Sequence, residues 1–85
     1  MEEKYEHHNV TVKIFVNGHA VDLEKGKITY DQIVALAYPN PNFEQNTYKV
    51  TYFRRDNQHE DAFTKGQSVE ITNDMSFTVI RAVRS

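Results

Sequence analysis

The chain has 85 residues, of which 39% are hydrophobic, and a net charge of −2 at pH 7, so it is long enough for one domain with one small core. Twelve acidic residues outnumber ten basic ones, which argues against nucleic-acid binding because contacts to phosphates need a basic surface. The absence of cysteine excludes disulfides, thiol nucleophiles, thiolate zinc sites and thioester carriers.

Hydropathy predicts the cellular location of the protein, and the composition of the two ends of the chain predicts the bounds of its domain. No apolar stretch approaches the roughly 20 residues that cross a bilayer, and the N-terminus lacks the pattern of a secretion signal, so a cytoplasmic protein is expected. Met1 to Asn9 are mostly charged and polar, which predicts a disordered tail over residues 1–9. We expect one domain over residues 10–82 and a C-terminal tail over residues 83–85.

Alternation of apolar and polar residues begins at Val10 and predicts a strand with one buried face, formed by Val10, Val12, Ile14 and Val16. Asn17-Gly18 follows, and both residue types tolerate the positive φ that a two-residue hairpin turn requires. Val21 and Leu23 are the next inward pair. The first two strands are therefore expected to form a hairpin.

A short helix is predicted after Lys25-Gly26, which ends the second strand. Thr29 and Gln32 have the spacing of a capping box, and Ile28 and Ile33 that of a hydrophobic staple. The apolar stripe of the helix has helical spacing and consists of Tyr30, Ile33, Val34 and Ala37. Pro39 is expected to end the helix because proline lacks a backbone amide.

The remaining sequence predicts three further strands. Thr47 to Arg54 alternates Tyr48, Val50 and Tyr52 with Lys49, Thr51 and Phe53, while Arg55 to Glu60 is expected to be a polar loop. Phe63 returns toward the core, and a short strand follows through Val69 and Ile71. The last strand begins after the Asn73-Asp74 turn, with Met75, Phe77 and Val79 on its buried face.

The element order is β-β-α-β-β-β, which predicts an α+β fold in which one helix packs on a mixed sheet. A right-handed crossover through the helix would place the last strand parallel to the first, and this is the β-grasp (ubiquitin-like) arrangement. A small antiparallel barrel with one helix uses the same elements and remains an alternative.

Several segments resemble the bacterial multiubiquitin domain family. These segments are Lys13–Gly18, Ile28–Ala37, Tyr48–Tyr52, Lys65–Val69 and Met75–Val79. The resemblance covers about Val10 to Ser85. It implies a ubiquitin-like protein modifier, whose C-terminal carboxylate is adenylated and passed through thioesters on partner enzymes to an amine. The implied partners are a ubiquitin-activating-like enzyme, a conjugating enzyme and a JAB-type metallopeptidase.

The tail departs from the pattern of ubiquitin and most relatives, which end in two glycines, because this chain ends in Arg81-Ala82-Val83-Arg84-Ser85. Glycine suits a tail that threads a narrow channel, and Val83 and Arg84 would not enter the same channel. Three alternatives follow: wider channels in the partner enzymes, trimming of the tail, or non-covalent assembly without conjugation.

Two candidate sites follow from this interpretation. The first is the C-terminal tail, with Ser85 as the point of attachment and Arg81 and Arg84 as contacts to an acidic partner surface; the alternative is a frayed end. The second is the sheet face opposite the helix, where Phe15, Phe53 and Ile80 are expected to be exposed among Lys13, Lys49, Thr51 and Thr78, with Arg54 and Arg81 as a basic rim. Scattered exposed apolar residues are the ordinary alternative.

No enzymatic activity, cofactor or metal is expected. The four histidines, His7, His8, His19 and His59, have no spacing that places three ligands on one element. His59-Glu60-Asp61 is expected to lie in a solvated loop. Two hypotheses remain open, a covalent modifier and a non-covalent interaction or self-assembling module, together with a less favoured nucleic-acid- or metabolite-binding protein.

Overall fold

The computed structural model describes residues 10–55 and 57–83. The predicted tail over residues 1–9 and the site residues Arg84 and Ser85 lie outside the described residues. In chain order the elements are β2 (Thr11–Val16), β3 (His19–Glu24), β4 (Lys27–Thr29), α1 (Tyr30–Ala37), β5 (Asn46–Arg54), β6 (Asn57–Phe63), β7 (Ser68–Glu70) and β8 (Met75–Val83). In the part of the chain that the structure describes, no helix is long and apolar enough to cross a membrane.

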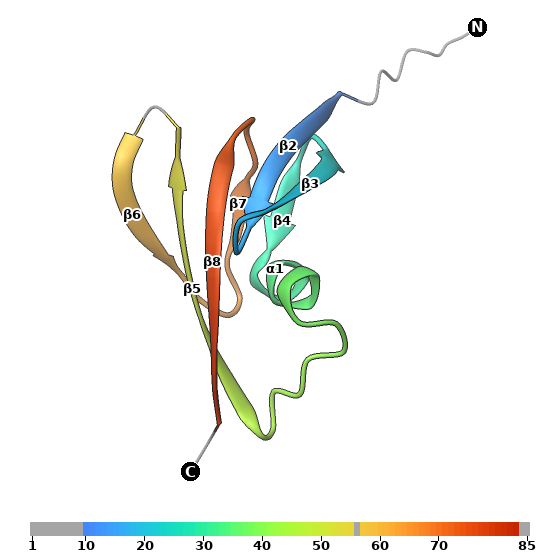
Figure 1. The fold of residues 1–85 in the computed structure, drawn as a ribbon, viewed down its shortest axis with the longest axis vertical. Helices are drawn as coiled ribbons and strands as arrows, with labels where there is room; N and C mark the ends of the chain where they lie inside the picture. Colours follow the sequence, from blue (N-terminus) through green and yellow to red (C-terminus); the bar gives the residue numbers. More distant parts are fainter. Residues whose placement is uncertain (1–9, 56, 84–85) are drawn as a thin grey trace, which may run out of the picture.

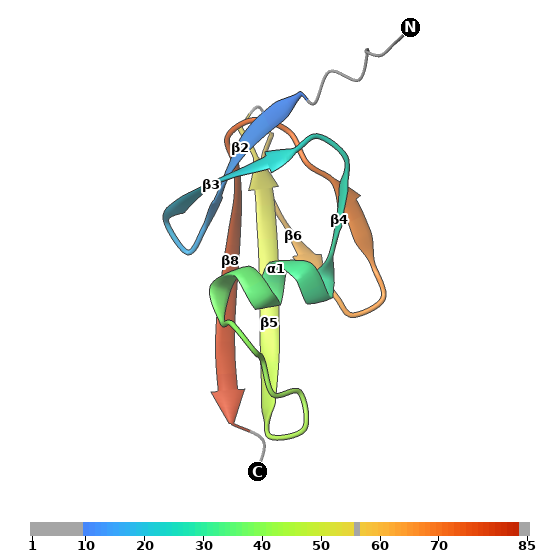
Figure 2. The ribbon, with the colours of Figure 1, turned by 90° about the vertical axis from the view of Figure 1, so that its right-hand side faces the viewer.

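Five strands form one mixed sheet in the order β3-β2-β8-β5-β6, and β4 and β7 form a separate two-stranded sheet. The β2–β8 pair is parallel, and the other pairs of the large sheet are antiparallel. Helix α1 crosses one face of this sheet (Figures 1 and 2). The fold class is therefore α+β, with one helix on a mixed sheet as predicted. Because β3 and β6 are unpaired edges among the described residues, the sheet is open and the barrel alternative is wrong.

The local signals at the hairpin and the helix are confirmed. Asn17 and Gly18 have φ values of 52° and 84°, as a hairpin turn with two left-handed residues needs. The Thr29 hydroxyl accepts from the Gln32 backbone amide (3.2 Å), and the Gln32 side chain accepts from the Thr29 backbone amide (2.8 Å). The helix ends at Ala37, directly before Tyr38 and Pro39.

The core lies between α1 and the sheet, and the alternating residues of each strand supply it. The buried residues are Val12, Ile14, Val16, Ile28, Tyr30, Ile33, Val34, Tyr48, Val50, Phe63, Ile71, Met75, Phe77 and Val79. Val10, predicted as the first inward residue, is 52% exposed because it precedes β2 and has no partner in that strand's ladder with β3. Val21, Leu23, Ala37 and Tyr52 pack against the core while half-buried.

Two segments that were not predicted as strands are strands, so the element order β-β-α-β-β-β is too short. Residues 57–63 form β6, although Arg55 to Glu60 was predicted to be a polar loop. β6 is an edge strand in which Phe63 is buried while His59 to Ala62 are exposed, so most of its sequence is polar. Ile28, which was predicted only to precede the helix, lies in the three-residue strand β4. It pairs there with Val69 of β7.

Asparagine side chains hold both ends of the short parallel ladder between β2 and β8. That ladder pairs Ile14 with Met75, Phe15 with Ser76 and Val16 with Phe77. At one end the Asn17 side chain accepts from the Val79 amide (2.8 Å) and donates to the Val79 carbonyl (3.1 Å). At the other end the Asn73 side chain accepts from the Lys13 amide (3.0 Å).

Tyr30 links the start of the helix to β5. Its hydroxyl donates to the Tyr48 carbonyl at 2.6 Å, and its ring lies edge-on to Phe63. Burial raises the pKa of the Tyr30 phenol above its ordinary value, and this effect outweighs the Lys65 ammonium, which lowers it. The buried hydroxyl is therefore kept in its neutral, donating form.

The Asn17 contacts to Val79 should contribute measurably to stability. Asn17→Gly keeps a residue that tolerates the positive φ but removes both hydrogen bonds, so we expect a loss of about 1–2 kcal/mol in urea denaturation. Asn40→Gly is the matched control, because Asn40 also has a positive φ (57°) but is exposed and has no described hydrogen bond to its side chain. Equal stability of the two variants would contradict the role given to Asn17.

The Tyr30 hydroxyl should make stability depend on alkaline pH. Tyr30→Phe removes its hydrogen bond and should cost about 1 kcal/mol at neutral pH. The pKa of the phenol is higher in the folded state, so its contribution is complete below about pH 10 and is lost as the pH rises through the folded-state pKa. Unfolding followed between neutral and alkaline pH should show a flatter profile for Tyr30→Phe than for the wild type.

Candidate protein-interaction surface

The sheet face opposite α1, here called the outer face, carries a row of two aromatic residues. Phe15 of β2 and Phe53 of β5 both pair with Ser76 of β8, so they lie on either side of it. Neighbouring strands are about 4.8 Å apart, which separates the two phenylalanine backbones by roughly 10 Å. Phe53 is 40% exposed and Phe15 is half-buried. The small side chain of Ser76 leaves room between them.

Ile80 lies on the same face but does not extend this row directly. It is 56% exposed and pairs with Lys49 of β5, four residues along β8 from Ser76. At about 3.3 Å per residue this is roughly 13 Å away, and the Thr51–Thr78 pair lies between. The outer-face patch, defined as Phe15, Phe53 and Ile80, is thus an aromatic pair and a separate isoleucine joined by threonines.

The basic rim predicted for this patch is wrong, because both arginines face the helix side of the sheet. The Arg54 guanidinium lies 5.7 Å from the Tyr52 ring centroid and donates to the Glu70 carbonyl. The Arg81 guanidinium lies 5.3 Å from the ring centroid of Tyr38, which follows α1. Aromatic rings attract these cations, and alternation along a strand puts each of them opposite its neighbour Phe53 or Ile80.

Lysines provide the basic charge of the outer face instead. Lys13 lies two residues before Phe15 on β2, and Lys49 is the cross-strand neighbour of Ile80. Both are exposed. The outer-face patch therefore combines exposed apolar side chains with positive charge, the composition that suits a partner surface with apolar and acidic groups.

The C-terminal end of β8 is held in the sheet through Val83. Ala82 pairs with Thr47 and Val83 with Asn46, so the described part of the predicted tail continues the strand. Val83 is 76% exposed. The strand runs past α1 and carries the chain away from the core (Figure 1).

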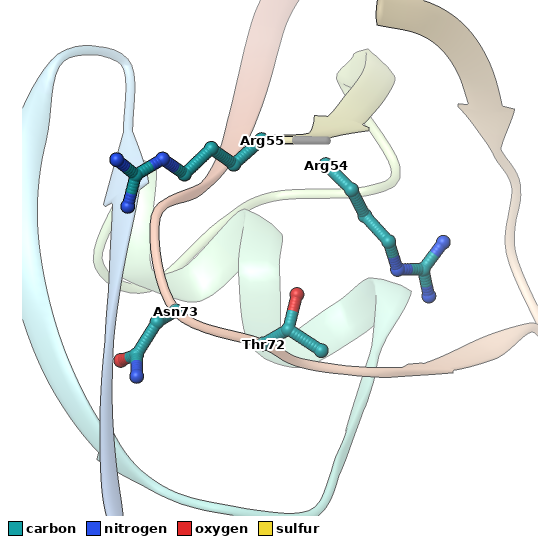
Figure 3. Close-up of a pocket in the computed structure, with 4 residues that line it drawn as sticks. All are labelled: Arg54, Arg55, Thr72 and Asn73. Carbon is teal, nitrogen blue, oxygen red and sulfur yellow. The ribbon is translucent and has the colours of Figure 1, made fainter. Parts of the chain in front are cut away.

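A shallow hollow near the other end of β5 is lined by Arg54, Arg55, Thr72 and Asn73 and has a volume of about 330 Å³. Figure 3 shows that the two arginine side chains extend in different directions. Arg55 forms an ion pair with Asp74 at 2.9 Å, and Arg54 donates to Glu70. The two cations do not converge on one ligand position, so the hollow lacks the geometry of an anion site.

The described histidines lie apart. His19 begins β3 and His59 lies in β6, where the predicted loop was wrong. Glu60 accepts a hydrogen bond from the Thr51 hydroxyl at 2.9 Å, so it stabilises the β5–β6 pair. Within residues 10–55 and 57–83 no group of three or more His, Asp or Glu side chains is placed to hold a metal ion.

Sequence reasoning missed the contacts that join distant segments. Lys65 lies 4.4 Å from the Phe43 ring centroid and forms an ion pair with Asp31 at 3.1 Å. Nothing local to these residues indicates the contact, because it depends on the path of the chain after β6. The Asn17 contacts to Val79 span 62 positions and were missed for the same reason.

The comparisons with known proteins agree with the resemblance seen in the sequence. The sequence model of one family, Multiubiquitin, matches residues 12–82, which is more than half of the chain. No curated protein and no solved structure matches significantly. The chain therefore belongs to the multiubiquitin family and is a ubiquitin-like module.

Proposed function

We propose that the chain is a β-grasp protein that acts as a covalent protein modifier, recognised through its outer face and joined to its targets through its C-terminus. Support for the β-grasp assignment comes from the strand order of the large sheet, in which the last strand lies parallel to the first at the centre. The helix crosses one face of that sheet, as the assignment requires.

The observation that carries this function is that one strand connects the outer-face patch to the chain end. β8 contributes Ser76, between Phe15 and Phe53, then Ile80, and then Val83 at its end. A partner enzyme docked on the outer face would therefore meet the C-terminal end of the same strand. The partners we propose are an activating enzyme, a conjugating enzyme and a JAB-type metallopeptidase, in a bacterial cytoplasm.

A non-covalent interaction module is the second candidate, and a specific observation favours it. Ala82 and Val83 are paired with β5, whereas a tail that enters an enzyme channel must be single-stranded. The exposed Phe53 and Ile80 side chains could bind a partner without any reaction at the C-terminus. The two candidates differ in whether ATP is required.

Adenylation is the direct test of the modifier. The chain should be incubated with ATP and an activating enzyme encoded beside its gene, and pyrophosphate release and a thiol-sensitive thioester should be measured. We expect both products with the native carboxylate and neither with a C-terminal carboxamide, which cannot be adenylated. Binding that occurs equally without ATP, with no adenylate even after trimming of the tail, would favour the non-covalent module.

The outer-face patch should be required for recognition by that enzyme. Phe53→Glu should reduce affinity by about thirtyfold, the scale of an interface hot spot, as measured by calorimetry. Leu36→Glu is the matched control, because Leu36 of α1 is also 40% exposed but lies on the helix. Melting curves of both variants check that the fold is kept. Equal effects of the two substitutions on affinity would argue against the patch.

A further inference from the structure

The sheet is longer on its β5–β8 side than on its β2 side, and this exposes part of one strand edge. β8 pairs with β5 from Ser76 to Val83, but with β2 only from Met75 to Phe77. Figure 2 shows β8 and β5 continuing together well past β2. Within residues 10–55 and 57–83, the segment of β8 after Phe77 therefore has a neighbouring strand on one side only.

The first hydrogen-bonding position of this exposed edge is occupied by a side chain. The amide and carbonyl of Val79 both bond to the Asn17 side chain. Backbone groups alternate in direction along a strand, so those of Arg81 and Val83 point to the same edge. No described residue hydrogen-bonds to these groups of Arg81 and Val83.

The opposite edge of the same two-stranded segment is partly covered. The Tyr48 carbonyl accepts from the Tyr30 hydroxyl, and the Asn46 amide donates to the Asn42 carbonyl at 3.0 Å. Asn46 is the first residue of β5, and the acceptor of its amide, Asn42, lies in the connection between α1 and β5. On the β5 edge one backbone group of Tyr48 and one of Asn46 are thus paired, whereas on the β8 edge no described residue pairs with Arg81 or Val83.

The chemistry around this edge indicates what can pair with it. Neither β5 nor β8 contains an acidic residue, while together they carry Lys49, Arg54 and Arg81. Arg81 flanks the edge on the helix side and Ile80 on the outer face. A second copy pairing about Arg81 by two-fold symmetry would bring two arginines together, which is unfavourable.

We propose that the exposed edge of β8, from Ile80 to Val83, binds an extended acidic segment of a partner protein as an additional strand. Its backbone would bond to Arg81 and Val83, and its acidic and apolar side chains would alternate between the Arg81 side and the Ile80 side. Main-chain hydrogen bonds supply affinity in such strand addition, and alternate side chains supply specificity. The Asn17 carboxamide marks where the added strand stops.

The test is an NMR titration of the full ¹⁵N-labelled chain with an acetylated peptide in which glutamate and valine alternate. We expect the largest amide shifts at Arg81 and Val83. Arg81→Glu should weaken binding by roughly fivefold, the size expected of an exposed ion pair. Lys25→Glu makes the same charge change in the turn before β4 and should leave binding unchanged. Val83→Pro should abolish binding, because it removes an amide that faces only the exposed edge.

Three results would overturn the proposal. One is a set of shifts centred on β3 or β6. Another is equal binding of a peptide in which lysine and valine alternate. The third is concentration-dependent self-association of the chain through β8 in sedimentation, which would assign the edge to a second copy. Because no ATP or enzyme is present, each result is independent of whether the C-terminus is conjugated.

Discussion

The short parallel ladder between β2 and β8 determines how the rest of the structure is arranged. It joins the N-terminal hairpin to the C-terminal strand, and three buried residues of each of the two strands, among them Ile14 and Phe77, belong to the core. The ladder is short, so backbone amide and carbonyl groups just beyond its two ends need other hydrogen-bond partners. Asn17 and Asn73 supply them from outside the ladder, and their side-chain amides take the positions that backbone groups of a longer strand would occupy.

This arrangement separates two roles within β8. Its first half is locked between β2 and β5, and its alternation places Met75 and Phe77 in the core and Ser76 on the outer face. Among the described residues, its second half has β5 as its one hydrogen-bonded neighbouring strand, and it carries the exposed Ile80 and Val83. Stability thus comes from one end of the strand while the exposed apolar and hydrogen-bonding groups belong to the other. Such a division allows a partner to bind without disturbing the core.

How much could be predicted from the sequence depended on the distance over which each signal acts. The Asn17-Gly18 turn, the Thr29 capping box and the alternation in β8 are local, and the structure confirms them. β6 was missed because Phe63 is the one large apolar residue in its sequence, so it lacks the apolar alternation on which strand prediction rests. The side of the sheet on which Arg81 lies follows from the same alternation, which puts it opposite Ile80, and this was overlooked; only its contact with the Tyr38 ring depends on where the helix ends relative to β8. The outer-face positions of Phe53 and Ile80 followed from alternation alone.

The lack of glycines near the end of β8 fits the pairing of that strand. Arg81-Ala82-Val83 contains residues that lose less conformational entropy in an extended strand than glycine does, and valine favours strands. A glycine tail would stay unpaired, whereas here Ala82 lies opposite Thr47 and Val83 opposite Asn46. Release of these two residues breaks few hydrogen bonds, each worth about 1 kcal/mol. An enzyme that needs this segment single-stranded therefore has to supply only a small free energy to unpair it from β5. A partner that adds a strand to the exposed edge of β8 does not have to unpair it at all.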